Sequence, residues 1–197
     1  MGEQHDIIFD LSARRGFAFH SGPPLRFSIS AGEGGWCPAS QKREGDNKTP
    51  LGVFAFRKLY LRTDRWPPAG LAVPFQALDP ADGWCDDPAD PNYNCFVRHP
   101  YSASAERLWR EDGLYDVVIS IGYNDAPVVP GHGSAIFIHI AREMEPTDGF
   151  GSNIPQLGRT RGCVSIERKS MPDLLAFLRP QTVFHIRDRL SPDFSVK

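Results

Sequence analysis

Two stretches of the sequence say most about the fold and the chemistry: Ala135-Ile136-Phe137-Ile138-His139-Ile140 and, later in the chain, Thr160-Arg161-Gly162-Cys163-Val164. The first is a short apolar run, which is typical of a buried β-strand, and it places a histidine near the end of that strand. The second sets a glycine directly before a cysteine, so the backbone can turn sharply and a substrate can approach the thiol closely. Together they offer a strand-bound His139 and Cys163 as a candidate base and a candidate nucleophile.

The rest of the chain predicts a mainly β fold with one or two short helices and long loop insertions. Apolar or alternating runs are separated by Gly, Pro and Asn, which punctuate strands as turns. The first three runs are expected to form hairpins, and residues 141–162 are expected to contain no strand. The expected strands cover residues 7–9, 17–19, 25–30, 53–60, 117–121, 135–140, 163–166 and 182–186, and the expected helices cover 102–112 and 170–178.

The length of 197 residues predicts one domain, spanning 1–197, with an insertion at about 63–100. Gly and Pro number 18 each, which favours many turns and few long helices. The net charge of −2 argues against a general nucleic-acid binder, because such proteins carry a dense basic surface. The apolar runs are too short for a membrane span.

A cysteine nucleophile needs a base and an oxyanion site, and the chain offers candidates for both. His139 is the candidate base, and Arg159 and Arg161 favour the thiolate of Cys163. Backbone N–H groups at Gly162 and Cys163 are candidates for holding the oxyanion. The plain alternative is a buried thiol and an ordinary strand histidine, and the residues alone favour it. His132, His139 and Cys163 also suit zinc, but no short-spaced ligand pair accompanies them, so no metal is expected.

The remaining cysteines and aromatic residues leave two questions open. Four cysteines permit three pairings; Cys85 and Cys95 are the nearest pair, and whether they are bridged stays undecided. The aromatic side chains of the loops either line a ligand groove or pack the insertion onto the sheet, and packing is favoured. These aromatic residues are Trp36, Trp66, Trp84 and Tyr93.

Several motifs together resemble the YkuD-type L,D-transpeptidase family, in particular its short single-domain proteobacterial branch. The resemblance runs from about residue 7 to residue 187. The motifs are Ile138-His139 with Thr160-Arg161-Gly162-Cys163-Val164, Thr49-Pro50-Leu51-Gly52-Val53-Phe54, the run from Gly131 to His139, Trp84-Cys85-Asp86-Asp87, Tyr93-Asn94 and Ile121-Gly122-Tyr123-Asn124. Three positions depart from the family pattern: Arg161 stands where many members have a second histidine, Ile140 follows the first histidine in place of glycine, and Ser165 stands where many members have arginine or asparagine.

The resemblance implies a YkuD-like β-sandwich and a cell-wall enzyme that needs no cofactor. Its substrates would be peptidoglycan stem peptides of the diaminopimelate type, joined through a Cys acyl-enzyme as diaminopimelate–diaminopimelate or L-alanine–diaminopimelate links. The implied catalytic residues are Cys163, His139 and Gly162. The implied substrate-binding residues are Arg161, Thr160, His132, Arg159, Tyr123 and Asn124.

Two other functions remain open from the sequence alone. If water replaces the acceptor amine, the same residues give an L,D-carboxypeptidase. If the cysteine is idle, the chain is a non-catalytic peptidoglycan-binding module. A peptidoglycan substrate implies a periplasmic location, although the sequence opens without the basic and apolar segments of a secretion signal. The oligomeric state is left open.

Overall fold

The computed structural model describes residues 5–19, 22–144 and 156–190 of the chain. Strands make up most of its regular structure, which confirms the expected mainly β class, with one α-helix and two short 3₁₀ turns. The elements are β1 (Asp6–Asp10), β2 (Arg15–Ala18), β3 (Leu25–Ser30), β4 (Trp36–Pro38), η1 (Ala39–Gln41), β5 (Thr49–Leu61), β6 (Phe75–Ala77), β7 (Asp82–Cys85), β8 (Phe96–Arg98), β9 (Ala105–Arg107), β10 (Val117–Ile121), β11 (Phe137–Ile140), β12 (Glu143–Met144), β13 (Gln156–Leu157), β14 (Val164–Ile166), η2 (Arg168–Ser170), α1 (Met171–Phe177) and β15 (Val183–Arg187).

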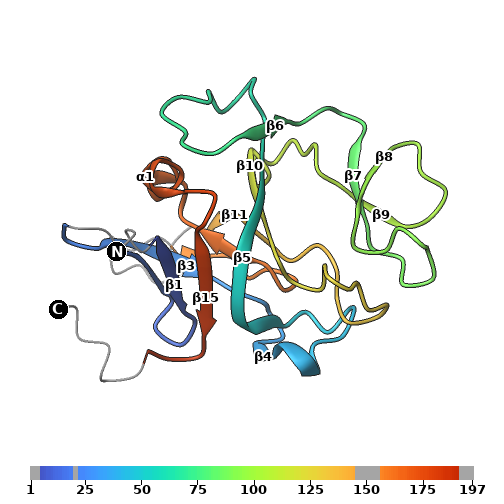
Figure 1. The fold of residues 1–197 in the computed structure, drawn as a ribbon, viewed down its shortest axis with the longest axis horizontal. Coiled ribbons are helices and arrows are strands. Elements are labelled where there is room, and N and C mark those ends of the chain that lie inside the picture. The colour runs from blue at the N-terminus through green and yellow to red at the C-terminus, as the bar shows by residue number, and fades with distance from the viewer. Residues whose placement is uncertain (1–4, 20–21, 145–155, 191–197) are drawn as a thin grey trace.

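The main sheet folds over on itself, because the two halves of the long strand β5 have different antiparallel partners. Its first half pairs antiparallel with β15, and its second half pairs antiparallel with β10. From β10 the order runs β11, β14, β3, β2, β1 and back to β15. The pairs β1–β2 and β2–β3 are antiparallel, which confirms the expected opening hairpins. Figure 1 shows β5 crossing the whole molecule, with α1 on one side of it and β7 to β9 on the other.

Alternation along the strands fills the inside of this sheet with apolar side chains. In β3, Phe27 and Ile29 point into the main hydrophobic cluster, and the following strands add residues such as Ile138 and Val164. Burial of one such side chain contributes roughly 1.5–3 kcal/mol. The short helix α1 covers one end of the cluster through Met171, Leu174 and Leu175. This helix was expected, but Ser170 does not cap it with its side chain; its Oγ donates to Glu167 Oε1 at 2.9 Å.

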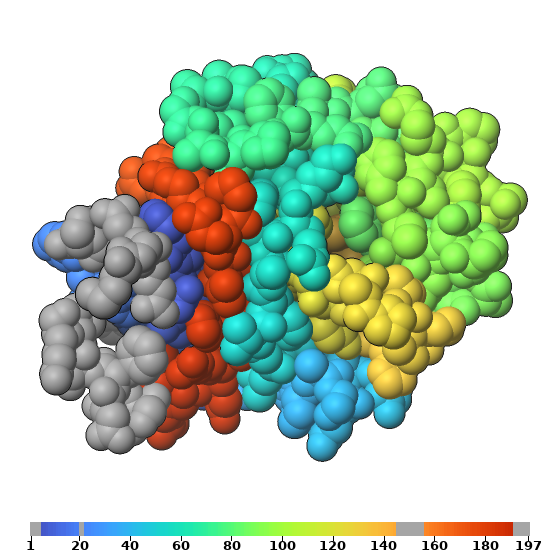
Figure 2. All heavy atoms as spheres, viewed as in Figure 1, coloured from blue at the N-terminus to red at the C-terminus, as the bar shows by residue number. Residues whose placement is uncertain are grey.

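A second apolar cluster lies on the other face of β10 and β11. It contains Tyr60, Tyr115, Val118 and Phe137, and Trp84 packs edge-to-face on Phe137 at 5.0 Å between ring centroids. Strands β8, β7 and β9 form the small sheet that carries Trp84. Figure 2 shows this part of the chain, in yellow-green, as a lobe beside the cyan atoms of β5.

Two expectations about secondary structure are wrong. Residues 102–112 form no helix, because Ala105–Arg107 pairs with Gly83, Trp84 and Cys85 of β7 instead. Long-range pairing here outweighs a local pattern of a Ser start and a Gly stop. Residues 141–162 are not strandless: β12 and β13 pair antiparallel within them, while residues 145–155 lie outside the described part. Across the described residues, no helix has the length and hydropathy needed to cross a membrane.

Candidate active site

The strands β11 and β14 run parallel and side by side, and they bring His139 and Cys163 to one face of the sheet. Ile138 pairs with Val164, and His139 pairs with Ser165. Because side chains alternate along a strand, His139 and Ser165 share the face opposite the main core. Cys163 directly precedes β14 and belongs to the second cluster on that same face. All three line a cavity of about 880 Å³.

The thiol of Cys163 is held by the backbone of the opposite strand. Its Sγ donates a hydrogen bond to Ala135 O at 3.2 Å, and the Phe137 N–H donates to Sγ at 3.3 Å. Burial, followed by the nearby charge of Glu106, raises the pKa of Cys163 to about 12, against the opposing effect of the Phe137 N–H. At neutral pH the resting cysteine is therefore a thiol, and a base must remove its proton before it can attack.

His139 has the tautomer that such a base requires. Its Nδ1 makes a 2.8 Å hydrogen bond with Ile140 O, which can only accept, so the proton is assigned to Nδ1 and the lone pair to Nε2. Burial lowers the pKa of His139 to about 4, which keeps the ring neutral at neutral pH. The ring of Tyr115 packs edge-on against the imidazole, with centroids 5.1 Å apart. The His139 imidazole and the Cys163 thiol are therefore both neutral at neutral pH.

Two threonines fix the backbone turn that carries Cys163. Thr160 Oγ1 donates to Cys163 O at 2.6 Å and accepts from the Gly162 N–H at 3.2 Å. Thr49 Oγ1 donates to the same carbonyl at 3.4 Å and accepts from the Gly32 N–H at 2.8 Å. The Gly162 N–H is thus already used within the turn. Of the two expected N–H groups, that of Cys163 is therefore the better candidate for an oxyanion site.

Gly162 is required at its position for two reasons. Its φ of +132° lies in the region that L side chains avoid, and an added Cβ would lie 3.0 Å from Lys48 O and 3.1 Å from Ile136 Cδ1. We expect Gly162→Ala to lower the free energy of unfolding by about 2–3 kcal/mol, measured by urea denaturation. Gly70→Ala is the matched control, because Gly70 has a φ of +71° but open space around it. If both variants lost the same free energy of unfolding, steric contact of the added Cβ at position 162 would not contribute.

Three of the expected substrate-binding residues line the cavity, and three do not. Thr160, Arg159 and Arg161 line it. His132, Tyr123 and Asn124 instead hold the loop before Ala135. The Tyr123 hydroxyl donates to His132 O, and Asn124 Nδ2 donates to Gly133 O at 2.9 Å. These contacts fix the loop that leads to Ala135, and none of them is made with the thiol of Cys163.

Asn94 connects this loop to Cys163. Its Oδ1 accepts from the Ala135 N–H at 3.0 Å and from Trp84 Nε1 at 2.8 Å. Its Nδ2 donates to the carbonyl oxygens of Tyr123, at 3.2 Å, and Asn124, at 2.8 Å. Ala135 in turn accepts the hydrogen bond of the Cys163 thiol. The Asn94 side chain therefore fixes the residue against which the thiol is held.

Sequence reasoning missed Glu106, Arg110 and Tyr115, which line the cavity beside the reacting pair. Glu106 Oε1 accepts from the Tyr115 hydroxyl at 2.8 Å, and the Arg110 guanidinium lies 5.0 Å from the centre of the Tyr115 ring. Burial raises the pKa of Glu106. Glu106 and Arg110 fell in the segment expected to be a helix, and a strand of three residues has no periodicity that would have revealed them.

The charge of Glu106 provides a test of the local electrostatics. We expect Glu106→Gln to lower the pKa of Cys163, and so to speed alkylation of that thiol by iodoacetamide about threefold to tenfold at fixed pH. Mass spectrometry of the Cys163 peptide separates this signal from that of the exposed Cys95. Glu143→Gln removes the same charge from an exposed position in β12 and serves as the control. Unchanged or slower alkylation of Glu106→Gln would contradict the prediction.

The cysteine pair and the loop aromatics that the sequence singled out lie outside this cavity. All four cysteines are free, so Cys85 and Cys95 are not bridged in this structure. Trp84 packs on Phe137, and Tyr93 is buried, donating its hydroxyl to Glu44 Oε2 at 2.5 Å. Within the ranges that the structure covers, no three His, Cys, Asp or Glu side chains gather as metal ligands.

Comparisons with known proteins address the whole chain. The family model of the YkuD L,D-transpeptidase catalytic domain matches residues 4–186. No curated protein matches the sequence. Similar solved structures include Bd1075 of Bdellovibrio bacteriovorus, at 13% identity and a TM-score of 0.48, covering 96% of this chain and 50% of that one. An L,D-transpeptidase of Mycobacterium smegmatis matches at 13% identity and a TM-score of 0.42, covering 94% and 59%.

The helical cell shape determining protein Pgp2 of Campylobacter jejuni matches at 15% identity and a TM-score of 0.44, covering 94% of this chain and 48% of that one. The chain thus spans about half the length of the first solved structures it resembles. The family model, in contrast, covers nearly all of this chain, from before β1 to within β15. The chain belongs to the YkuD family of L,D-transpeptidase catalytic domains.

Proposed function

We propose that this protein is a peptidoglycan L,D-transpeptidase that works through a Cys163 acyl-enzyme in the periplasm. The observation that carries the proposal is that Cys163 and His139, from adjacent parallel strands, line one cavity. Family membership supports the same reaction class. The substrates are peptidoglycan stem peptides of the diaminopimelate type, and the product is either a diaminopimelate–diaminopimelate or an L-alanine–diaminopimelate link.

The first half-reaction forms the acyl-enzyme. His139 Nε2 takes the thiol proton, and Sγ attacks the donor carbonyl carbon of the stem. The Cys163 N–H donates to the oxygen of the tetrahedral intermediate. When the C–N bond breaks, the imidazolium returns its proton to the departing amine. Because both groups start neutral, the step requires the thiol to leave Ala135 O and reach Nε2 as the substrate binds.

The second half-reaction transfers the acyl group to an amine. The acceptor amine attacks the thioester, His139 takes the proton that the amine loses, and the thiol is regenerated. The cavity wall offers carboxyl oxygens of Glu106 and Asp86 to the N–H groups of the acceptor amine, and guanidinium groups of Arg159 and Arg161 to stem carboxylates. One oxygen of Asp86, Oδ1, is buried without a partner among the described residues, which suits a ligand that donates hydrogen bonds.

Product analysis by mass spectrometry tests the proposal. Purified protein and its Cys163→Ala variant are incubated with disaccharide-tetrapeptides that contain diaminopimelate. We expect dimers from the wild type and none from the variant, and fragmentation of the dimer identifies the joined residues. A shortened monomer alone would indicate an L,D-carboxypeptidase. Unchanged stems in both samples would contradict the catalytic assignment and favour a peptidoglycan-binding module.

A further inference from the structure

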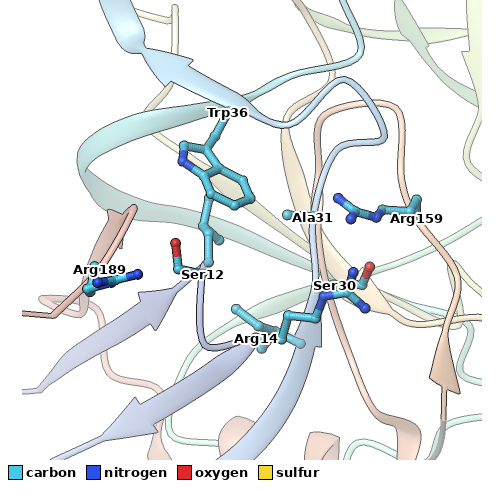
Figure 3. A pocket seen from close by; sticks show the side chains of 9 residues that line it. Ser12, Arg14, Ser30, Ala31, Trp36, Arg159 and Arg189 are labelled. Atoms are coloured by element: carbon cyan, nitrogen blue, oxygen red, sulfur yellow. The ribbon is translucent and has the colours of Figure 1, made fainter.

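A second cavity, of about 350 Å³, lies beside the active site and is lined by three arginines. We call it the arginine pocket; its walls include Arg14, Arg159, Arg189, Ser12, Ser30 and Trp36. Figure 3 shows Arg14 and Arg159 reaching toward Ser30 from different segments, with the Trp36 indole and Arg189 across from them. The chain brings these residues together from the β1–β2 turn, the end of β3, the start of β4, and the segments before β14 and after β15.

The positive charge of the arginine pocket is not neutralised by the neighbouring carboxylates. None of its three guanidinium groups makes an ion pair with the residues that the structure describes; Arg159 Nη1 donates only to Gly32 O, at 3.4 Å. Two carboxylates of the adjoining segments make other contacts. Asp10 accepts from the N–H groups of Ala13 and Leu190, and Asp188 accepts from the Ser12 hydroxyl at 2.6 Å.

The floor of the pocket contains a polar atom that lacks a partner. Ser30 is only 3% exposed, and its Oγ is buried without a hydrogen bond to any described residue. A buried hydroxyl left in this state is unfavourable, since it has lost its water without gaining a protein partner. A ligand oxygen that reached Ser30 between Arg14 and Arg159 would accept from all three. Guanidinium groups bind carboxylate and phosphate oxygens in paired hydrogen bonds.

The pocket is a neighbour of the reaction cavity. Arg159 lines both. Ser30 in β3 pairs directly with Ser165 in β14, and Ser165 lines the reaction cavity. Directly opposite residues of an antiparallel pair point to the same face of a sheet, so the two cavities lie over one continuous surface. One extended substrate can therefore occupy both.

We propose that the arginine pocket binds a carboxylate of the peptidoglycan stem peptide whose reacting group lies at Cys163. The inference rests on the proposed function, because it takes its substrate from there. A stem peptide carries several free carboxylates along an otherwise uncharged backbone, and the Trp36 ring offers an apolar surface to that backbone. Arg159, shared by both cavities, orients the peptide between the two ends.

Binding is measured by isothermal titration calorimetry on the Cys163→Ala protein, in which no turnover occurs. The ligands are the free-acid tetrapeptide stem, the same stem with its carboxylates amidated, and inorganic phosphate. The pocket variant adds Arg14→Gln and Arg189→Gln, both at exposed positions; the control adds Arg15→Gln, which removes a neighbouring charge outside the pocket. Thermal unfolding of each variant checks that the fold is retained.

We expect the free-acid stem to bind the pocket variant about tenfold more weakly than the parent, with the control unchanged. The amidated stem should bind the parent and the pocket variant equally weakly. Equal affinity of both proteins for the free-acid stem would overturn the inference. So would an equal loss in the control, or a loss confined to phosphate, which would make the pocket a site for free oxyanions.

This outcome is independent of the test for the proposed function. If the wild type forms no product but the free-acid stem still requires Arg14 and Arg189, the proposed function fails and the carboxylate site stands. If the wild type forms dimers and the pocket variant binds stems normally, the proposed function stands and the carboxylate site fails. In the active protein, the pair of Arg→Gln changes should raise KM about tenfold and leave kcat nearly unchanged, because the pocket binds ground state and transition state alike.

Discussion

Replacing His139 with glutamine should reduce the rate of cross-link formation about 100-fold to 10,000-fold. Glutamine fills a similar space and retains a hydrogen-bonding group near Ile140 O, but it cannot take the proton of the Cys163 thiol. The thiol, with a pKa of about 12, then stays protonated at neutral pH. The rate is measured as dimer formation from disaccharide-tetrapeptides under single-turnover conditions. His185→Gln is the control, because His185 lies in β15 and contacts Asp6 at 3.1 Å, outside the reaction cavity.

The same variant should change how stability depends on pH. The pKa of His139 is about 4 when folded and about 6.5 when unfolded, so the unfolded chain binds the extra proton between these values. This contribution to stability is full above about pH 6.5 and is lost as the pH falls to about 4, a difference of roughly 3 kcal/mol. Between neutral pH and about pH 4, wild type should lose that much more unfolding free energy than His139→Gln in urea titrations. Identical losses would contradict the burial of a neutral imidazole.

Replacing Asn94 with alanine should cost about 3–4 kcal/mol of unfolding free energy and most of the activity. The change leaves the buried Ala135 N–H, the Trp84 indole N–H and two carbonyls without their partner. Each orphaned buried group costs about 1–3 kcal/mol, partly relieved by relaxation. Activity should fall at temperatures where the variant is still folded, because Ala135 would no longer hold the thiol of Cys163 in place.

Asn92→Ala is the matched control for Asn94. Asn92 is exposed, and its side-chain amide makes one hydrogen bond, to the Tyr101 hydroxyl at 2.9 Å. Its loss should change stability by about 0.5 kcal/mol or less. A stable and active Asn94→Ala protein would show that the loop before Ala135 is held by other contacts. If Asn94→Ala lost stability but kept full activity below its melting temperature, the result would contradict the idea that Asn94 positions the thiol of Cys163 through Ala135.

The sequence predicted strands well where alternating or continuous apolar residues formed an unbroken pattern. Residues 25–30 and 117–121 were expected as strands and match β3 and β10 residue for residue. Their alternation and their continuous apolar run leave little choice of secondary structure. Residues 102–112 show the opposite case, because the pairing partner of Ala105–Arg107 lies about twenty residues earlier in β7. No pattern local to that segment contains this pairing.

The candidate site divides in the same way. His139 and Cys163 were candidates from local features, a strand end and a Gly-Cys turn, and the family resemblance selected them over an ordinary strand histidine and a buried thiol. The contacts that tune them are not local. Glu106 reaches Tyr115 only once β9 is paired with β7, whose Trp84 packs on Phe137 of β11. The side chain of Asn94 was noted through the family resemblance, but its four hydrogen bonds depend on three separate segments.

The position of β15 in the main sheet limits when the sheet can close during synthesis of the chain. The last strand, β15, lies between β1, the first strand, and β5. A nascent chain leaving the ribosome therefore exposes two unpaired strand edges until residues 183–187 have emerged. Open edges of this kind attract other extended chains. A fragment that ends before β15 would keep both strand edges open and would be prone to aggregation, because the sheet can close only after residues 183–187 have been synthesised.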